Sequence, residues 1–114
     1  KLFKRIYSIE RHKTLLEKAK KILNNLNISN IVFYHGDGIK GWPANFLFER
    51  IIITAVAKSL PAKIIKQMSN ECILVLPLVH DNEQYITKVI KKNNKIYFKK
   101  YWKVRFVPLT RGIN

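Results

Sequence analysis

Apolar positions divide the chain into one amphipathic helix and several short strands. Over residues 11–27, apolar side chains recur at helical spacing opposite lysine, glutamate and asparagine, which predicts a helix with one buried stripe. The stripe consists of Leu15, Leu16, Ala19, Ile22, Leu23 and Leu26. Apolar runs over residues 5–10, 30–35, 48–55 and 72–78 predict strands, and the third is typical of a strand covered on both faces.

The C-terminal third predicts an antiparallel hairpin. Asn93 and Asn94 separate two strand-like segments, residues 84–92 and 95–109, and a two-residue asparagine turn suits the twist of paired strands. Residues 59–68 predict a short helix with proline near its start. Strands that alternate with helices and end in a hairpin indicate an α/β sandwich.

Composition narrows the classes of site that the chain can carry. Its 114 residues suffice for one small domain. The one cysteine, Cys72, opens an apolar run, so we expect it buried, without a disulfide, in a cytoplasmic protein. The three histidines are far apart, so we expect no metal site, and no apolar run predicts a membrane span.

The net charge of +15 has two interpretations. A basic surface binds nucleic acid or anionic membranes, and aromatic residues among the lysines of residues 95–103 suit stacking against single-stranded bases. Alternatively, abundant lysine, isoleucine and asparagine reflect AT-rich coding sequence, and the aromatic residues belong to a half-buried strand. The sequence leaves both open.

Gly36, Gly38 and Gly41 have the G-x-G-x-x-G spacing of a dinucleotide-binding loop. Such a loop needs a helix directly after it, but Trp42 and Pro43 follow, and the next strand begins too soon for a crossover helix. We therefore predict a turn at the carboxyl end of a strand, in which Gly36 and Gly38 adopt backbone angles unfavourable for other residues.

Two acidic residues follow neighbouring predicted strands, and each has two interpretations. Asp37 either projects a carboxylate into the crevice at the strand ends or caps the turn. Glu10 either accepts hydrogen bonds from ribose hydroxyls or stabilises the N-terminus of the following helix. Together, at adjacent strand ends, they predict a nucleotide site.

The order of several motifs resembles the protein-L-isoaspartate (D-aspartate) O-methyltransferase family. These motifs are YSIER, HGDG-x-x-GW, F-x-x-IIITA, ILVLPL and VRFVPL-x-x-G. The resemblance implies that residues 1–114 are the C-terminal portion of a single S-adenosylmethionine-dependent methyltransferase domain. It implies a Rossmann-like class I methyltransferase sandwich with a C-terminal antiparallel hairpin. The family methylates isoaspartyl carboxylates in damaged proteins and thereby initiates their repair.

The resemblance also implies site residues. Glu10 would hold the ribose of S-adenosyl-L-methionine, Asp37 and Gly38 would face its adenine, and Thr54 and Ala55 would line the crevice near the methyl donor. The substrate peptide would contact Ala55 and the VRFVPL segment, through Val104, Phe106, Val107 and Leu109. Core packing is the alternative for the last three.

No catalytic residue is expected. The nucleophile is a carboxylate with an ordinary pKa of about 4, already ionised at neutral pH, so methyl transfer needs no general base. Alignment with the sulfonium donor and exclusion of water then supply most of the rate.

Two family elements are missing from this chain: the glycine-rich cofactor loop E-x-G-x-G-x-G, and the N-terminal segment rich in Ser and Thr. Both would precede Lys1, and the central first strand, between residues 5–10 and 48–55, would be absent. We therefore expect a longer protein or a partner that supplies the missing half. The alternative functions are a basic Rossmann-like module that binds or methylates RNA, and an inactive remnant.

Overall fold

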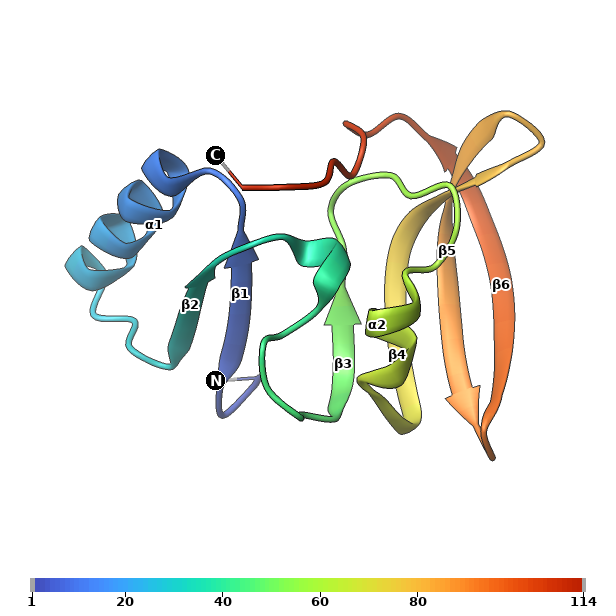
Figure 1. Ribbon diagram of the computed structural model, residues 1–114, viewed down its shortest axis with the longest axis horizontal. Helices are drawn as coiled ribbons and strands as arrows, with labels where there is room; N and C mark the ends of the chain where they lie inside the picture. The colour runs from blue at the N-terminus through green and yellow to red at the C-terminus, as the bar shows by residue number, and fades with distance from the viewer. Residues whose placement is uncertain (1, 114) are drawn as a thin grey trace. The chain divides into compact units, whose positions relative to one another are not determined.

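The computed structural model describes residues 2–113, which form two compact units (Figure 1). The first unit comprises residues 2–42 together with 111–113, so the C-terminal segment belongs with the N-terminal third. The second unit is Pro43–Thr110. Neither helix among the described residues has the length and hydrophobicity that a membrane crossing needs.

The first unit is a β-α-β motif with two parallel strands. Strand β1 (Ile6–Glu10) is followed by helix α1 (Lys13–Asn25) and strand β2 (Ile31–His35). The register runs from Ile6 opposite Ile31 to Glu10 opposite His35. Both strands therefore end at the same edge of the sheet.

Helix α1 ends at the asparagine cluster, as predicted. Asn27 takes a left-handed backbone with φ of 58°, which asparagine tolerates better than most residues. The amide of Asn27 donates to the carbonyl of Asn24 at 3.1 Å, and that of Ile28 donates to Leu23 at 2.9 Å. These are the two hydrogen bonds of a Schellman motif, which satisfy the last carbonyls of the helix.

The predicted buried stripe of α1 is wrong for three of its six residues. Leu16 is buried and Ala19 and Leu23 are half-buried, whereas Leu15, Ile22 and Leu26 are exposed. A two-stranded sheet is too narrow to cover a stripe of this width, so much of the apolar surface of α1 faces solvent.

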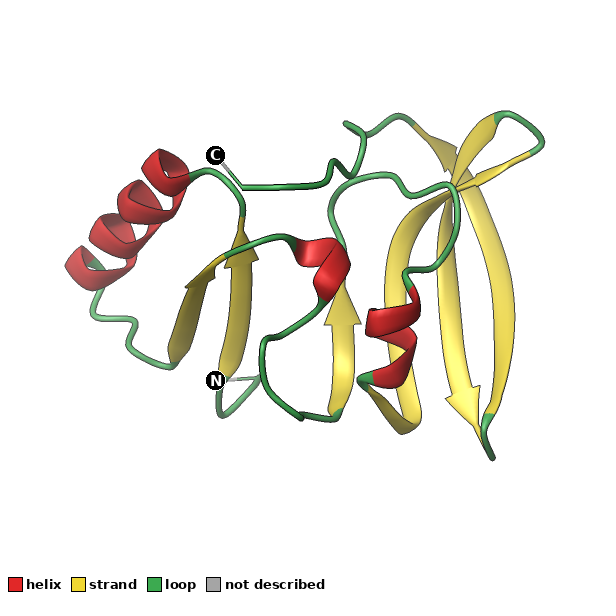
Figure 2. Ribbon diagram, in the orientation of Figure 1, coloured by secondary structure: helices red, strands yellow, loops and turns green. Residues whose placement is uncertain are grey.

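The second unit is a mixed four-stranded sheet with one short helix (Figure 2). Its strands are β3 (Phe48–Ile52), β4 (Met68–His80), β5 (Glu83–Lys92) and β6 (Lys95–Val104), in that order across the sheet. Strands β3 and β4 are parallel and the other pairs antiparallel. Helix α2 (Ala62–Lys66) follows Pro61 and connects the parallel pair.

Two tight turns build the antiparallel part of this sheet. Asn93 and Asn94 both have positive φ, 51° and 61°, as a type I′ hairpin turn requires, and this confirms the predicted hairpin. Asp81 and Asn82 repeat the geometry between β4 and β5, with φ of 50° and 65°. The sequence pair Asp81-Asn82 is the signal from which the hairpin of β4 and β5 could have been predicted.

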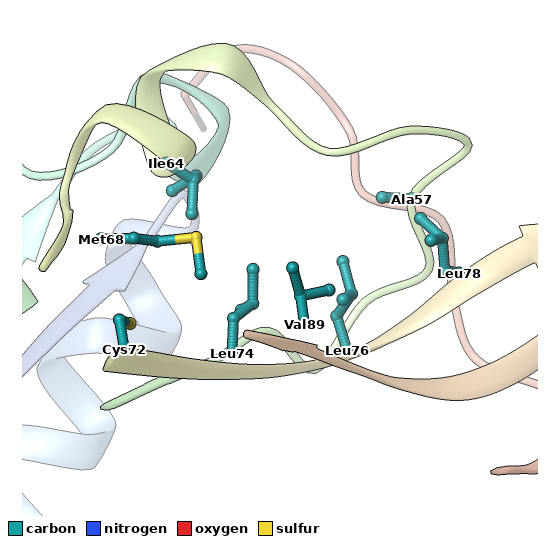
Figure 3. Packing of buried hydrophobic residues seen from close by; sticks show 8 residues of the cluster. All are labelled: Ala57, Ile64, Met68, Cys72, Leu74, Leu76, Leu78 and Val89. Carbon is teal, nitrogen blue, oxygen red and sulfur yellow. The ribbon is translucent and has the colours of Figure 1, made fainter. Parts of the chain in front are cut away.

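The core of the second unit lies on one face of the sheet (Figure 3). Cys72, Leu74, Leu76 and Leu78 alternate along β4, so they share that face. They pack with the other buried members of the cluster, which are Ala57, Ile64, Met68 and Val89. Cys72 is fully buried, as predicted.

Several predicted boundaries change in the structure. The helix expected over residues 59–68 spans only Ala62–Lys66, and Met68 begins β4 instead. Strand β3 ends at Ile52 and is not covered on both faces, because Ile52 remains 73% exposed among the described residues. Strand β4 extends beyond residues 72–78 at both ends. Strand β6 ends at Val104, and the following residues pair with the chain after β3 instead.

Candidate functional site

Glu10 and Asp37 lie at the same edge of the β1–β2 sheet. Glu10 is the last residue of β1 and pairs with His35, the last residue of β2. The amide of Gly36 donates to the carbonyl of Glu10 at 3.0 Å, which carries the pairing one residue further. Asp37 follows directly, so the two acids occupy adjacent strand ends, as the sequence predicts.

The carboxylate of Glu10 is half-buried and only partly used by the fold. Its Oε1 accepts a hydrogen bond from the amide of His12 at 3.4 Å, just before α1 begins. Its Oε2 accepts no hydrogen bond from the residues that the structure describes. Glu10 therefore contacts the backbone just before α1 through one carboxylate oxygen.

Asp37 is only 7% exposed, and both carboxylate oxygens accept backbone hydrogen bonds. Oδ1 accepts from Ile39 at 3.0 Å, which caps the short 3-10 turn Gly38–Lys40. Oδ2 accepts from Gly112 at 3.1 Å. The turn-capping interpretation of Asp37 is thus realised. A carboxylate offers about four acceptor positions, so these two hydrogen bonds do not use its full acceptor capacity.

The predicted backbone angles of Gly36 and Gly38 are wrong. Gly41 takes the left-handed backbone of this loop, with φ of 69°. Gly36 is needed for space, because an added Cβ would overlap the Tyr34 ring. At Gly38 the same Cβ would meet nothing within 4 Å.

Trp42 occupies the place where a dinucleotide loop would pack a helix. Its indole lies 4.9 Å from the ring of Tyr7 and 5.8 Å from that of Tyr34, centroid to centroid. Residue 42 therefore belongs to an aromatic cluster on β1 and β2, and the G-x-G-x-x-G spacing is not a phosphate loop.

The second unit brings together the residues that the resemblance assigns to the substrate. The amide of Val56 donates to the carbonyl of Val107, and the amide of Leu109 donates to Val56, both at 2.8 Å. Gln84 accepts a hydrogen bond from the amide of Phe106 at 2.6 Å, a contact that the sequence did not reveal. The VRFVPL segment thus pairs with Val56, the residue that follows Thr54 and Ala55 in the chain.

Exposure separates these residues into two groups. Thr54, Phe106 and Val107 are exposed, the last by 70%, so they are available to a ligand. Ala55, Val104 and Leu109 are half-buried. Leu109 packs against the core cluster, so the core-packing alternative holds for Leu109 and not for Val107.

The ionisable side chains with perturbed pKa values are not among the candidate cofactor-binding or substrate-binding residues. Burial raises the pKa of the Cys72 thiol and keeps it protonated at neutral pH. The ammonium group of Lys103 lowers the pKa of Glu83, 2.9 Å away, and Glu83 raises that of Lys103. Residues 2–113 contain no group of three or more side chains suited to a metal ion.

Comparison with known proteins extends over nearly the whole chain. The family model for protein-L-isoaspartate (D-aspartate) O-methyltransferase matches residues 2–114. The protein-L-isoaspartate O-methyltransferase of Paramagnetospirillum magneticum is 39% identical over 99% of this chain and 54% of its own length. That of Vibrio cholerae is 38% identical over 98% of this chain and 53% of its own length. The chain spans about half the length of these relatives.

A solved structure shares the fold. A protein-L-isoaspartate O-methyltransferase from Plasmodium falciparum, crystallised with S-adenosyl-L-homocysteine, superposes with a TM-score of 0.81. The superposition covers 93% of this chain and 52% of the Plasmodium falciparum chain, at 23% sequence identity. This similarity confirms the predicted Rossmann-like methyltransferase fold. With the family model matched from residue 2 to residue 114, the chain belongs to the protein-L-isoaspartate (D-aspartate) O-methyltransferase family.

Proposed function

We propose that this chain is the C-terminal portion of a single protein-L-isoaspartate O-methyltransferase domain. The activity is methyl transfer from S-adenosyl-L-methionine to the carboxylate of isoaspartyl residues in damaged proteins, which initiates their repair. The observation that carries this proposal is the placement of Glu10 and Asp37 at adjacent parallel strand ends. Ligands of open α/β sheets bind at that edge.

The free acceptor positions suit the two ends of adenosine. Oε2 of Glu10 would accept from the ribose hydroxyls, since no described residue donates to it. Asp37 would accept from the amino group of adenine, with the backbone of Gly38 beside the ring. Thr54 would lie near the methyl donor.

The substrate residues suit an extended peptide. Ala55 and the VRFVPL segment, through Val104, Phe106, Val107 and Leu109, would contact the isoaspartyl substrate largely by backbone and apolar interactions. The bound carboxylate is already ionised, so the protein contributes orientation and exclusion of water rather than proton transfer.

A complementary N-terminal half would pair with free strand edges in the two sheets. Among the residues that the structure describes, β1 pairs only with β2, and β3 only with β4, so each of the two sheets has a parallel strand with one unpaired edge. The missing half, in the same or another chain, would supply strands that pair with these edges.

The single cysteine, which cannot form a disulfide within the chain, supports the cytoplasm as the compartment.

Isothermal titration with S-adenosyl-L-homocysteine tests the proposal. The chain alone is compared with the chain joined to the N-terminal half of the Paramagnetospirillum magneticum relative, here called the extended protein. We expect the extended protein to bind and to methylate an isoaspartyl peptide. Glu10→Gln should weaken binding about tenfold, the effect of one hydrogen bond to a charged group.

Glu17→Gln is the matched control, because Glu17 is an exposed acid on α1 remote from the strand ends. An extended protein that folds but binds no S-adenosyl-L-homocysteine would overturn the proposal. Binding without methyl transfer would favour the inactive-remnant alternative. The comparisons favour the methyltransferase over a module that binds or methylates RNA.

A further inference from the structure

The backbone of Gly112 is held at its amide and at its carbonyl by residues at the candidate nucleotide site. Its amide donates to Oδ2 of Asp37 at 3.1 Å, and its carbonyl accepts from Nε of Arg11 at 3.3 Å. Nη2 of Arg11 also donates to the carbonyl of Arg111 at 3.4 Å. We call this group of residues the C-terminal clamp; it consists of Arg11, Asp37, Arg111 and Gly112.

The clamp lies at the edge where both predicted cofactor carboxylates lie. Arg11 directly follows Glu10 at the end of β1, and Asp37 follows β2. The contacts join residues 101 and 75 positions apart in the chain, so they are tertiary contacts rather than local turns. In Figure 1 the red end of the chain lies near the loop that leads from β1 to α1, which carries Arg11.

The backbone of the clamp depends on glycine. Gly112 has φ of 89°, a conformation that other L-residues rarely adopt. An added Cβ would meet nothing within 4 Å, so the position demands a glycine for its backbone angle and not for lack of space. The backbone conformation at Gly112 is therefore specified by residue type as well as by its partners.

We propose that Arg11 is a positioning residue for S-adenosyl-L-methionine, and that it acts through residues 111–112. The guanidinium fork holds two consecutive carbonyls, and this aims the amide of Gly112 at Asp37. The held segment then fixes the Asp37 carboxylate and forms one side of the adenosine site. Because these groups are ordered before the ligand arrives, less conformational entropy is lost on binding. This inference rests on the proposed function.

Arg11→Met in the extended protein tests the proposal, because methionine keeps much of the side-chain stem and removes every donor. We expect the Kd for S-adenosyl-L-homocysteine and the KM for S-adenosyl-L-methionine to rise about five- to tenfold. The KM for the isoaspartyl peptide and the melting temperature should not change. A purely structural role would lower the melting temperature without selecting one substrate.

Two controls make the result decisive. Arg50→Met removes a guanidinium whose hydrogen bond goes to the adjacent carbonyl of Glu49, and it should leave cofactor affinity unchanged. Gly112→Ala should weaken binding more than Gly112→Asn, because asparagine tolerates positive φ better than alanine.

The outcomes separate this inference from the proposed function. Equal cofactor affinity in Arg11→Met and Arg50→Met would overturn the positioning role and leave the methyltransferase assignment intact. If the unsubstituted extended protein does not bind S-adenosyl-L-homocysteine, both fail. Faster hydrogen exchange at the Gly112 amide in Arg11→Met, with weaker cofactor binding, would support the clamp.

Discussion

At the scale of single residues, one short loop shows how identical side chains serve different purposes. Gly36 makes room for the Tyr34 ring, Gly41 supplies a left-handed backbone, and Gly38 meets neither requirement. A spacing motif records only that glycines are present. Their separate reasons explain why this loop matches a dinucleotide fingerprint without its geometry.

Gly36→Ala should therefore destabilise the protein, whereas Gly38→Ala should not. A Cβ at position 36 overlaps the Tyr34 ring, so the ring must shift from its present place near Trp42. We expect a loss of about 1–3 kcal/mol in the free energy of unfolding, as for other overpacked sites. Urea denaturation of the extended protein measures it. Gly38→Ala should stay within about 0.5 kcal/mol, the usual range at unconstrained surface sites, and equal losses would contradict this account.

Cys72 should react with thiol reagents only when the protein opens. Its side chain is fully buried and its raised pKa keeps the thiolate fraction low at neutral pH. We expect alkylation of the folded extended protein to be at least about 100-fold slower than in denaturing urea. A variant with Cys72→Ala and Ser59→Cys carries its thiol at an exposed position and should react at once. Similar rates for the two proteins would show that the core around Cys72 is open.

At the scale of elements, the sequence predicts turns and helix ends, but it does not predict which apolar side chains are covered by distant parts of the chain. The asparagine that ends α1 and the Asn93–Asn94 turn follow from backbone preferences of the residues themselves. The exposure of Leu15 and Ile52 depends on what packs above them, which periodicity does not report. The pairing of Asp37 with Gly112 joins distant residues, and no spacing signal announces it.

The hairpin of β5 and β6 contains a like-charge pair whose replacement should stabilise it. Lys88 stands directly opposite Lys99, and neither forms an ion pair with a carboxylate among the described residues. Lys88→Glu should raise the free energy of unfolding by about 0.2–1 kcal/mol, since opposed unlike charges attract. Lys88→Gln removes only the repulsion, so its free energy of unfolding should lie between those of the unsubstituted protein and Lys88→Glu. Salt at 1 M should shrink these differences, and a Lys88→Glu protein less stable than Lys88→Gln would refute the prediction.

At the scale of the whole molecule, the unpaired strand edges connect the fold to the proposed function. Strands β1 and β3 are parallel strands, a type that is ordinarily buried within a sheet. Each has one neighbour among the described residues. Their free backbone groups are templates for another strand, and the exposed apolar residues Leu15 and Ile52 add to the surface that a partner would cover.

The chain alone should consequently associate with itself, whereas the extended protein should remain monomeric. Sedimentation velocity over a range of concentrations measures this difference. Ile52→Lys should reduce the association of the isolated chain, because a charge on an exposed edge strand opposes pairing with another chain. Ile51→Lys is the matched contrast: its half-buried side chain packs against the core, so it should unfold the second unit instead. If the isolated chain is monomeric at every concentration and melts cooperatively, its free edges need no partner, and the proposal of a complementary half fails.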